Sequence, residues 1–270
     1  MNENEIVEKI IEEGTKETIG KAVSGVGSFF NKICSPAAEE LGLYLKDKMH
    51  IYRVMNLYKI TQKVQKKLEN NQKYQTNPRS LINFVEKASL CEDDNIQNMW
   101  AGLLLGRLTQ PAQEDTDIIY YDLLNSLSIY QARILKLIYA DDRICTFEQP
   151  LKICSNENEL NLKEKIQIPI KQILENSPIP LDYIIHNETH NEVVNNKDMY
   201  SITIGYIIPN FAGLQKMNLI KTYKINLENN YIEFDPTLLG LDFYMNCTGY
   251  KVYPLEAYLV TRKYWLQNKK

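Results

Sequence analysis

The fold is decided by a helix start in the first half of the chain, Asp93-Asp94-Asn95-Ile96-Gln97-Asn98-Met99-Trp100-Ala101. Its acidic residues suit the positive end of a helix dipole, and apolar residues then recur at helical spacing. The predicted buried face consists of Ile96, Met99, Trp100, Leu103, Leu104 and Leu108. Gly102 and Gly106 would allow a neighbouring helix to approach closely. The stretch therefore predicts a core helix of a helical domain.

Two more helix starts precede this stretch. Ser35-Pro36 places a serine at the N-cap and a proline at the first helical position, and it predicts a long basic helix over residues 36–70. Asn77-Pro78 predicts a shorter helix in the same way. The inward side chains of that shorter helix would be Leu81, Phe84, Val85 and Ala88. Residues 1–127 are therefore expected to form a helical N-terminal domain.

The second half of the chain changes in character at Ser128, which with Gln131 predicts a capping box. Residues 150–199 are interpreted as a polar insertion with one helix at 161–175. Next comes a predicted helix over 206–218, interrupted at Pro209. It is followed by a hairpin with its turn at Asn229-Asn230 and by a helix over 236–247. This order predicts a winged-helix-like α/β domain over 128–249, followed by an aromatic and basic tail, 250–270.

Several of these segments resemble the bacterial abortive-infection alpha family. Its pattern is similar to Pro36–Gly42, to Asp93-x-x-x-Gln97-x-Met99-Trp100-Ala101-x-Leu103-Leu104, and to Leu127-Ser128-x-x-x-Ala132-x-Ile134-Leu135. Met217–Ile220 and Leu239–Phe243 are similar to the family's C-terminal end, so the resemblance covers residues 36 to 247. The resemblance implies a role in anti-phage defence. It implies no chemistry, because the family has no established catalytic residues to carry over.

The bulk composition is that of a globular protein. The chain has 270 residues, 44% of them hydrophobic and 24% charged, which favours two domains. A net charge of −3 argues against general binding of polyanions. Five scattered cysteines without a CxxC pair fit reduced thiols in the cytoplasm. Met199 to Gln215, the longest uncharged run, is shorter than the roughly 20 residues of a membrane-spanning helix.

One segment, residues 15–33, has an amphipathic pattern interrupted by glycines. Its candidate membrane or oligomer face consists of Ile19, Val23, Val26, Phe30 and Ile33. Gly20, Gly25 and Gly27 lower helix propensity by about 1 kcal/mol each, so this helix needs a surface to pack on. That surface would be a membrane, a second subunit or the protein's own core. We expect a cytoplasmic protein, with contact to the inner face of the membrane as an open alternative.

A second candidate surface is basic. Lys59, Lys63 and Lys66 lie away from the apolar positions of the long helix and predict an exposed polyanion stripe. The alternative is an ordinary solvated helix face.

Signals for catalysis are weak. His186-Asn-Glu188-Thr-His190 departs from the His-Glu-x-x-His order of zinc proteases and lies in a polar segment. The phosphate-binding patterns GxGxxG and GxxxxGK[ST] are not in the sequence. We therefore expect neither an enzyme nor a bound metal or cofactor.

The sequence thus predicts an abortive-infection-type defence protein that acts by binding a protein partner, with membrane association as a further option. Two alternatives remain open. One is a winged-helix regulator that binds DNA, although its candidate recognition helix carries only Lys216. The other is a toxin with an unrecognised catalytic site. No small-molecule substrate is indicated.

Overall fold

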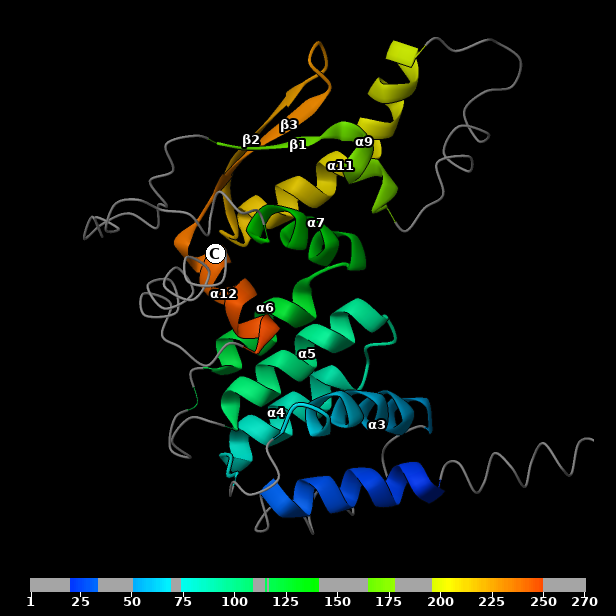
Figure 1. Cartoon of the computed structure of the whole chain (residues 1–270), viewed down its shortest axis with the longest axis vertical. Coiled ribbons are helices and arrows are strands. Elements are labelled where there is room, and N and C mark those ends of the chain that lie inside the picture. The colour runs from blue at the N-terminus through cyan, green and yellow to red at the C-terminus, as the bar shows by residue number, and fades with distance from the viewer. Residues whose placement is uncertain are drawn as a thin grey trace, which may run out of the picture. The chain divides into compact units, whose positions relative to one another are not determined.

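The computed structural model describes residues 20–33, 51–68, 74–108, 115, 117–140, 165–177 and 196–249. Within them the chain is mostly helical, with one small antiparallel sheet (Figure 1). The chain divides into two compact units. Unit 1 comprises residues 1–126 together with 247–250, and unit 2 comprises residues 127–246 and 251–270.

Unit 1 is built from helices. A helix over residues 20–33 precedes α3 (Ile51–Gln65), α4 (Pro78–Ala88), α5 (Asp94–Arg107) and α6 (Asp117–Ser126) (Figure 1). Helix α3 packs mainly on α5, while α6 packs on both α4 and α5. Residues 36–50 and 69–70 of the predicted long helix, like residues 1–19, lie outside the described residues.

The starts of α4 and α5 follow the sequence prediction. Asn77 caps α4 by accepting a hydrogen bond from the Arg79 amide at 2.9 Å, and Pro78 opens the helix. Asp93 caps α5 by accepting one from the Ile96 amide at 3.0 Å. A side-chain cap satisfies an amide that has no partner within the helix. Both predicted helices are thereby confirmed.

The core of unit 1 surrounds Trp100, which is 1% exposed. Its ring lies 5.6 Å from that of Phe84 in a T-shaped arrangement and 5.7 Å from that of Tyr121. Aromatic pairs at such distances add to the free energy gained by burial. The predicted inward side chains of α4 are all buried, and of those predicted for α5 only Met99 is partly exposed.

Only one of the two glycines of α5 marks a close approach. A Cβ atom on Gly102 would lie 1.9 Å from the Cys247 carbonyl oxygen and 2.9 Å from the Gly249 nitrogen. A Cβ atom on Gly106 would have nothing within 4 Å. The prediction is therefore confirmed for Gly102 and wrong for Gly106.

Unit 2 combines helices with a three-stranded sheet (Figure 1). Its elements in chain order are α7 (Ile129–Tyr139), β1 (Ile166–Pro169), α9 (Ile170–Glu175), α11 (Asn196–Lys216), β2 (Ile220–Asn226), β3 (Tyr231–Pro236) and α12 (Leu238–Thr248). Strand β3 is central and pairs antiparallel with β1 on one side and β2 on the other. The capping box of Ser128 and Gln131 at the start of α7 is confirmed.

Within the predicted polar insertion, the helix expected at 161–175 is wrong for residues 166–169 and confirmed for residues 170–175. Residues 166–169, predicted as helix, form β1, whose alternating Ile166 and Ile168 are buried against the core. Ile168 pairs with Ile232 of β3, and this long-range pairing outweighs the local helical pattern. Helix α9 then buries Ile170, Ile173 and Leu174. Both elements are thus integral parts of unit 2.

Helix α11 is longer than predicted and continues through Pro209. It ends at Lys216, and the left-handed φ of 58° at Asn218 allows the Leu219 amide to donate back to the Leu214 carbonyl at 3.0 Å. The predicted hairpin of β2 and β3 is confirmed, but its loop spans residues 227–230, because Asn226 pairs with Tyr231. The two-residue turn was therefore wrong, and Asn226 Oδ1 instead accepts a hydrogen bond from the Asn229 amide at 3.0 Å.

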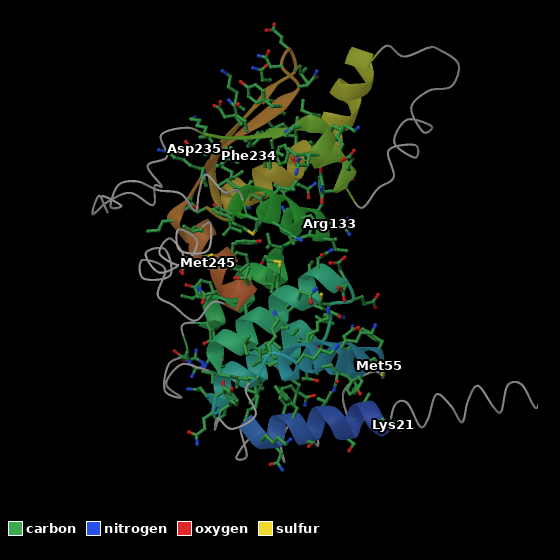
Figure 2. The ribbon with its side chains drawn as sticks, viewed as in Figure 1. Lys21, Met55, Arg133, Phe234, Asp235 and Met245 are labelled. Atoms are coloured by element: carbon green, nitrogen blue, oxygen red, sulfur yellow. The ribbon has the colours of Figure 1, made fainter. Side chains whose placement is uncertain are left out.

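The core of unit 2 lies where α7 and α11 meet the sheet. The Phe211 ring of α11 lies 5.3 Å from that of Phe234 on β3. Along β3 buried Phe234 alternates with more exposed Asp235, as expected for a strand with one buried face (Figure 2). The Tyr139 hydroxyl of α7 donates to the Leu219 carbonyl and accepts from the Thr237 amide at 3.1 Å. Tyr139 therefore ties both ends of the hairpin to α7.

Candidate functional site

The first candidate site is the outer face of α11, which we define as Gly205, Ile208, Pro209, Ala212 and Lys216. All five residues are exposed, and the Ile208 side chain is 40% exposed. The opposite side of the helix buries Ile207, Phe211 and Leu214. The outer face is therefore mostly small and apolar, and it carries a single cation at its C-terminal end.

The hairpin beside α11 carries no excess of positive charge. Between Ile220 and Pro236 it has Lys221 and Lys224 against Glu228, Glu233 and Asp235. Lys224 and Glu233 are register partners, which places opposite charges across the two strands. Gln215 of α11 donates to the Lys221 carbonyl at 3.0 Å and joins the helix to the strand. This part of unit 2 has mixed charge.

The second candidate is a buried polar cluster in unit 1, the Asp117 cluster, formed by Ser80, Arg107, Asp117 and Tyr121. Asp117 Oδ2 accepts hydrogen bonds from Ser80 Oγ at 2.7 Å and from Tyr121 Oη at 2.6 Å. Arg107 Nε lies 3.8 Å from the same oxygen, and its side chain is 0% exposed. Three helices, α4, α5 and α6, thus meet at one carboxylate.

The electrostatics of the Asp117 cluster are those of a desolvated site. Burial, reinforced by the Asp117 charge, raises the pKa of Tyr121 well above its usual value. Tyr121 therefore stays protonated and keeps donating to Asp117. Asp117 Oδ1 is also buried, and it has no hydrogen-bond partner within the described part of the chain. A serine, a tyrosine and a carboxylate are common in active sites, but these side chains are shut off from solvent.

Sequence reasoning missed the Asp117 cluster. The acidic run Glu114–Asp117 after Pro111 predicts a loop, whereas Asp117 opens α6 and is 6% exposed. One usable signal was the pattern Asp117-x-x-x-Tyr121-x-x-Leu124, which places a carboxylate on the inward face of a short helix.

The apolar face predicted in residues 15–33 is largely occupied by the protein itself. Val26, Phe30 and Ile33 are buried, whereas Val23 is 37% exposed. Ile19 lies outside the described residues. Gly25 faces the Tyr58 ring of α3, and the Ile33 carbonyl accepts a hydrogen bond from the Thr76 amide at 3.1 Å. Of the three surfaces considered for this segment, the protein's own core is thus the one on which its buried apolar side chains pack.

The predicted basic stripe contains two exposed lysines and one that is half-buried. Lys59 and Lys66 are exposed. Lys63 is half-buried and donates to Asp94 Oδ1 at 2.5 Å and to Asn98 Oδ1 at 2.9 Å. This interaction lowers the pKa of Asp94. The expectation that Lys63 is exposed was therefore wrong, because α5 supplies it with a carboxylate.

Several other features noted in the sequence lie outside the described residues. His186, His190 and the tail 250–270 are outside them. Among the residues that are described, no group of three or more histidine, cysteine, aspartate or glutamate side chains could hold a metal ion. Within the same residues, no helix is long and apolar enough to cross a membrane.

Fold and sites together define a mostly helical protein of two units, with an apolar helix face in one and a buried polar cluster in the other. A model of the abortive infection alpha family matches residues 53–247, and the chain belongs to this family. The resemblance noted in the sequence is thereby confirmed, and with it an abortive-infection-type role in defence. No curated protein and no solved structure matches the chain.

Proposed function

We propose that this defence protein acts by binding a protein partner through the outer face of α11, without catalysis. The observation that carries the proposal is the composition of this face. Gly205, Ile208, Pro209 and Ala212 expose apolar surface, and Lys216 alone is charged. An apolar patch with a polar edge is typical of surfaces that bind proteins.

Unit 2 is, in this proposal, a winged-helix-like module. Its element order of helix, strand, two helices, hairpin and helix supports this assignment. So does the sheet order β1-β3-β2, in which the first strand pairs with the last strand of the hairpin. Helix α11 then occupies the position of the recognition helix, which in DNA-binding relatives of this architecture lies in the major groove.

The charges of α11 and the hairpin favour protein over DNA as the partner. Binding to DNA depends on several lysine or arginine contacts to phosphates. From Gly205 to Lys216, α11 has Lys216 as its one cation, and three carboxylates outnumber two lysines on the hairpin. A DNA-binding regulator therefore remains the weaker alternative.

A membrane surface has less support than a protein partner. The side chains that would insert into a bilayer, including Val26 and Phe30, are buried within the chain. The opposite side of the same helix exposes Lys21, Ser24, Ser28 and Lys32, which is a polar surface. Interfacial binding needs an exposed apolar face.

The proposal includes no catalysis because the Asp117 cluster, the buried polar cluster of the described residues, is closed to solvent. In the Asp117 cluster the carboxylate already accepts two hydrogen bonds, and Tyr121 and Ser80 are 0% exposed. A substrate would have to reach the carboxylate through the packed helices. A toxin with a catalytic site elsewhere is the remaining alternative.

The test introduces charge on the outer face of α11. Ile208→Glu and Ala212→Glu should each reduce protection of bacteria, against a phage that the wild-type chain restricts, by at least tenfold in plating efficiency. Both residues are exposed, so the melting temperature should stay within about 2 °C of the wild type, as for most surface substitutions. Gln172→Glu is the matched control, because it adds the same charge at an exposed helical position of unit 2.

Two further measurements separate the alternatives. Lys216→Ala removes the cation of the outer face, so lost protection together with lost salt-dependent DNA binding would favour the DNA-binding regulator. Light scattering of wild type and Ala212→Glu shows whether the partner is a second copy. Full protection by both glutamate variants would refute the proposed surface.

A further inference from the structure

Helix α6 buries few residues, and most of them belong to the Asp117 cluster. Its three buried residues are Asp117, Tyr121 and Leu124, and two of them belong to the cluster. Its largest exposed apolar side chain, Ile119, is 58% exposed. In contrast, α5 buries ten of its residues. Besides the Tyr121 ring contacts and the Lys87–Asp122 ion pair, the attachment of α6 therefore depends on the hydrogen bonds of the Asp117 cluster, which form in only one position of the helix.

The contacts of Asp117 are unequal. Oδ2 receives the Ser80 and Tyr121 hydroxyls, and Arg107 Nε at 3.8 Å is beyond hydrogen-bond distance of it. Oδ1 is buried and receives no hydrogen bond from the described residues. A buried ion pair offsets the cost of desolvating two charges only when its geometry is good and its remaining atoms are satisfied.

This geometry has an energetic consequence. Breaking such a pair by removing one partner leaves a buried charge and is strongly destabilising, whereas replacing both partners by apolar side chains is often neutral or stabilising. The Arg107–Asp117 pair therefore contributes less to the stability of unit 1 than to fixing where α6 lies.

We infer that the Asp117 cluster is a conformational switch, at which α6 detaches from α4 and α5 while the rest of unit 1 stays folded. Detachment removes the Tyr121 ring from Phe84 and Trp100, each 5.7 Å away between ring centroids. It thereby exposes an aromatic surface on α4 and α5. The inference concerns unit 1 and goes beyond the proposed function, which concerns the outer face of α11.

Hydrogen exchange of the full chain tests the opening step. In the wild type, amides of α6 should exchange at least tenfold faster than those of the centre of α5. Asp117→Asn should widen this ratio at least tenfold further, because it removes the charge that Arg107 faces. Asn125→Ala is the control, since Asn125 lies on the same helix and is exposed. Equal exchange rates in α6 and α5 of the wild type would overturn the inference.

A double variant tests the role of the Arg107–Asp117 pair. Arg107→Met with Asp117→Leu should melt no lower than the wild type, slow the exchange of α6 to the rate of α5, and reduce phage protection at least tenfold. Full protection by this variant would show that opening is not needed. A melting temperature as low as that of Asp117→Asn would show that the pair is a plain stabiliser, and would equally refute the inference. Neither substitution alters α11, so the test of the outer face is independent.

Discussion

Tyr139 on α7 and Thr237 before α12 are joined by a buried hydrogen bond, in which the Thr237 amide donates to the Tyr139 hydroxyl at 3.1 Å. The same hydroxyl donates to the Leu219 carbonyl, so one side chain serves two backbone groups from opposite ends of the hairpin. Thr237 in turn caps α12, because its Oγ1 accepts from the Gly240 amide at 3.0 Å. The hydroxyl of Tyr139 thus fixes the start of α12 as well as the hairpin.

Tyr139→Phe should lower the free energy of unfolding of unit 2 by about 1–3 kcal/mol, because a buried amide and a buried carbonyl lose their partner. Urea denaturation followed by circular dichroism measures the change. Tyr231→Phe is a suitable control, since Tyr231 is only partly buried. A loss no larger than that of the control would contradict the role given to Tyr139.

The same hydroxyl predicts a dependence on alkaline pH. Burial raises the pKa of Tyr139 from its ordinary value of 10.0 to about 12. The protonated form is thus favoured in the folded state, and its contribution to stability is complete below pH 10 and lost as the pH rises toward 12. Melting temperatures measured across this range should fall less steeply for Tyr139→Phe than for the wild type. If the melting temperatures of both proteins fall in parallel, the pKa of Tyr139 does not differ between the folded and unfolded states.

The two glycines of α5 provide a matched pair. Gly102→Ala should destabilise unit 1 by about 1–3 kcal/mol, because its Cβ would lie 1.9 Å from the Cys247 carbonyl oxygen. Gly106→Ala has open space and should stabilise the helix by up to about 1 kcal/mol. Thermal melts of both variants measure the difference, and equal shifts would argue against the packing of residues 247–249 on α5.

Trp100→Ala should lower the free energy of unfolding by about 3–5 kcal/mol, because it removes a fully buried ring from between Phe84 and Tyr121. Trp100→Phe keeps most of the aromatic contact and should cost less. Chemical denaturation gives both values. An unchanged midpoint for Trp100→Ala would remove Trp100 from the core.

Cys91 should react slowly with alkylating reagents. Burial raises the pKa of its thiol from 9.0 to about 11, with the charges of Asp93 and Glu92 acting in the same direction. Since the thiolate is the reactive form, alkylation at pH 8 should be about a hundredfold slower than for a thiol of ordinary pKa. Peptide mass spectrometry after timed treatment with iodoacetamide measures the rate, and unfolding in urea should restore it. Equal rates in both states would contradict this prediction.

Features set by neighbouring residues could be predicted from the sequence. The helix starts at Asn77, Asp93 and Ser128 depend on residues two or three positions away, and all three are confirmed. Strand β1 could not be predicted, because four residues become a strand only through β3, more than sixty positions along the chain. The two candidate sites differ in the same way. The residues of the outer face of α11 follow from helical periodicity, whereas the Asp117 cluster joins residues from three helices.

The composition of unit 1 bears on how the chain is made. Helices α3 to α6 leave the ribosome early, but the residues that pack against Gly102 belong to 247–250. About 120 residues of unit 2 are synthesised in between, roughly the length of a whole domain. Unit 1 therefore acquires its last part only when translation has passed residue 246, and until then residues 247–249 do not cover the surface of α5 beside Gly102. A nascent chain stalled before residue 247 would carry a nearly complete unit 1 with this surface still unfilled.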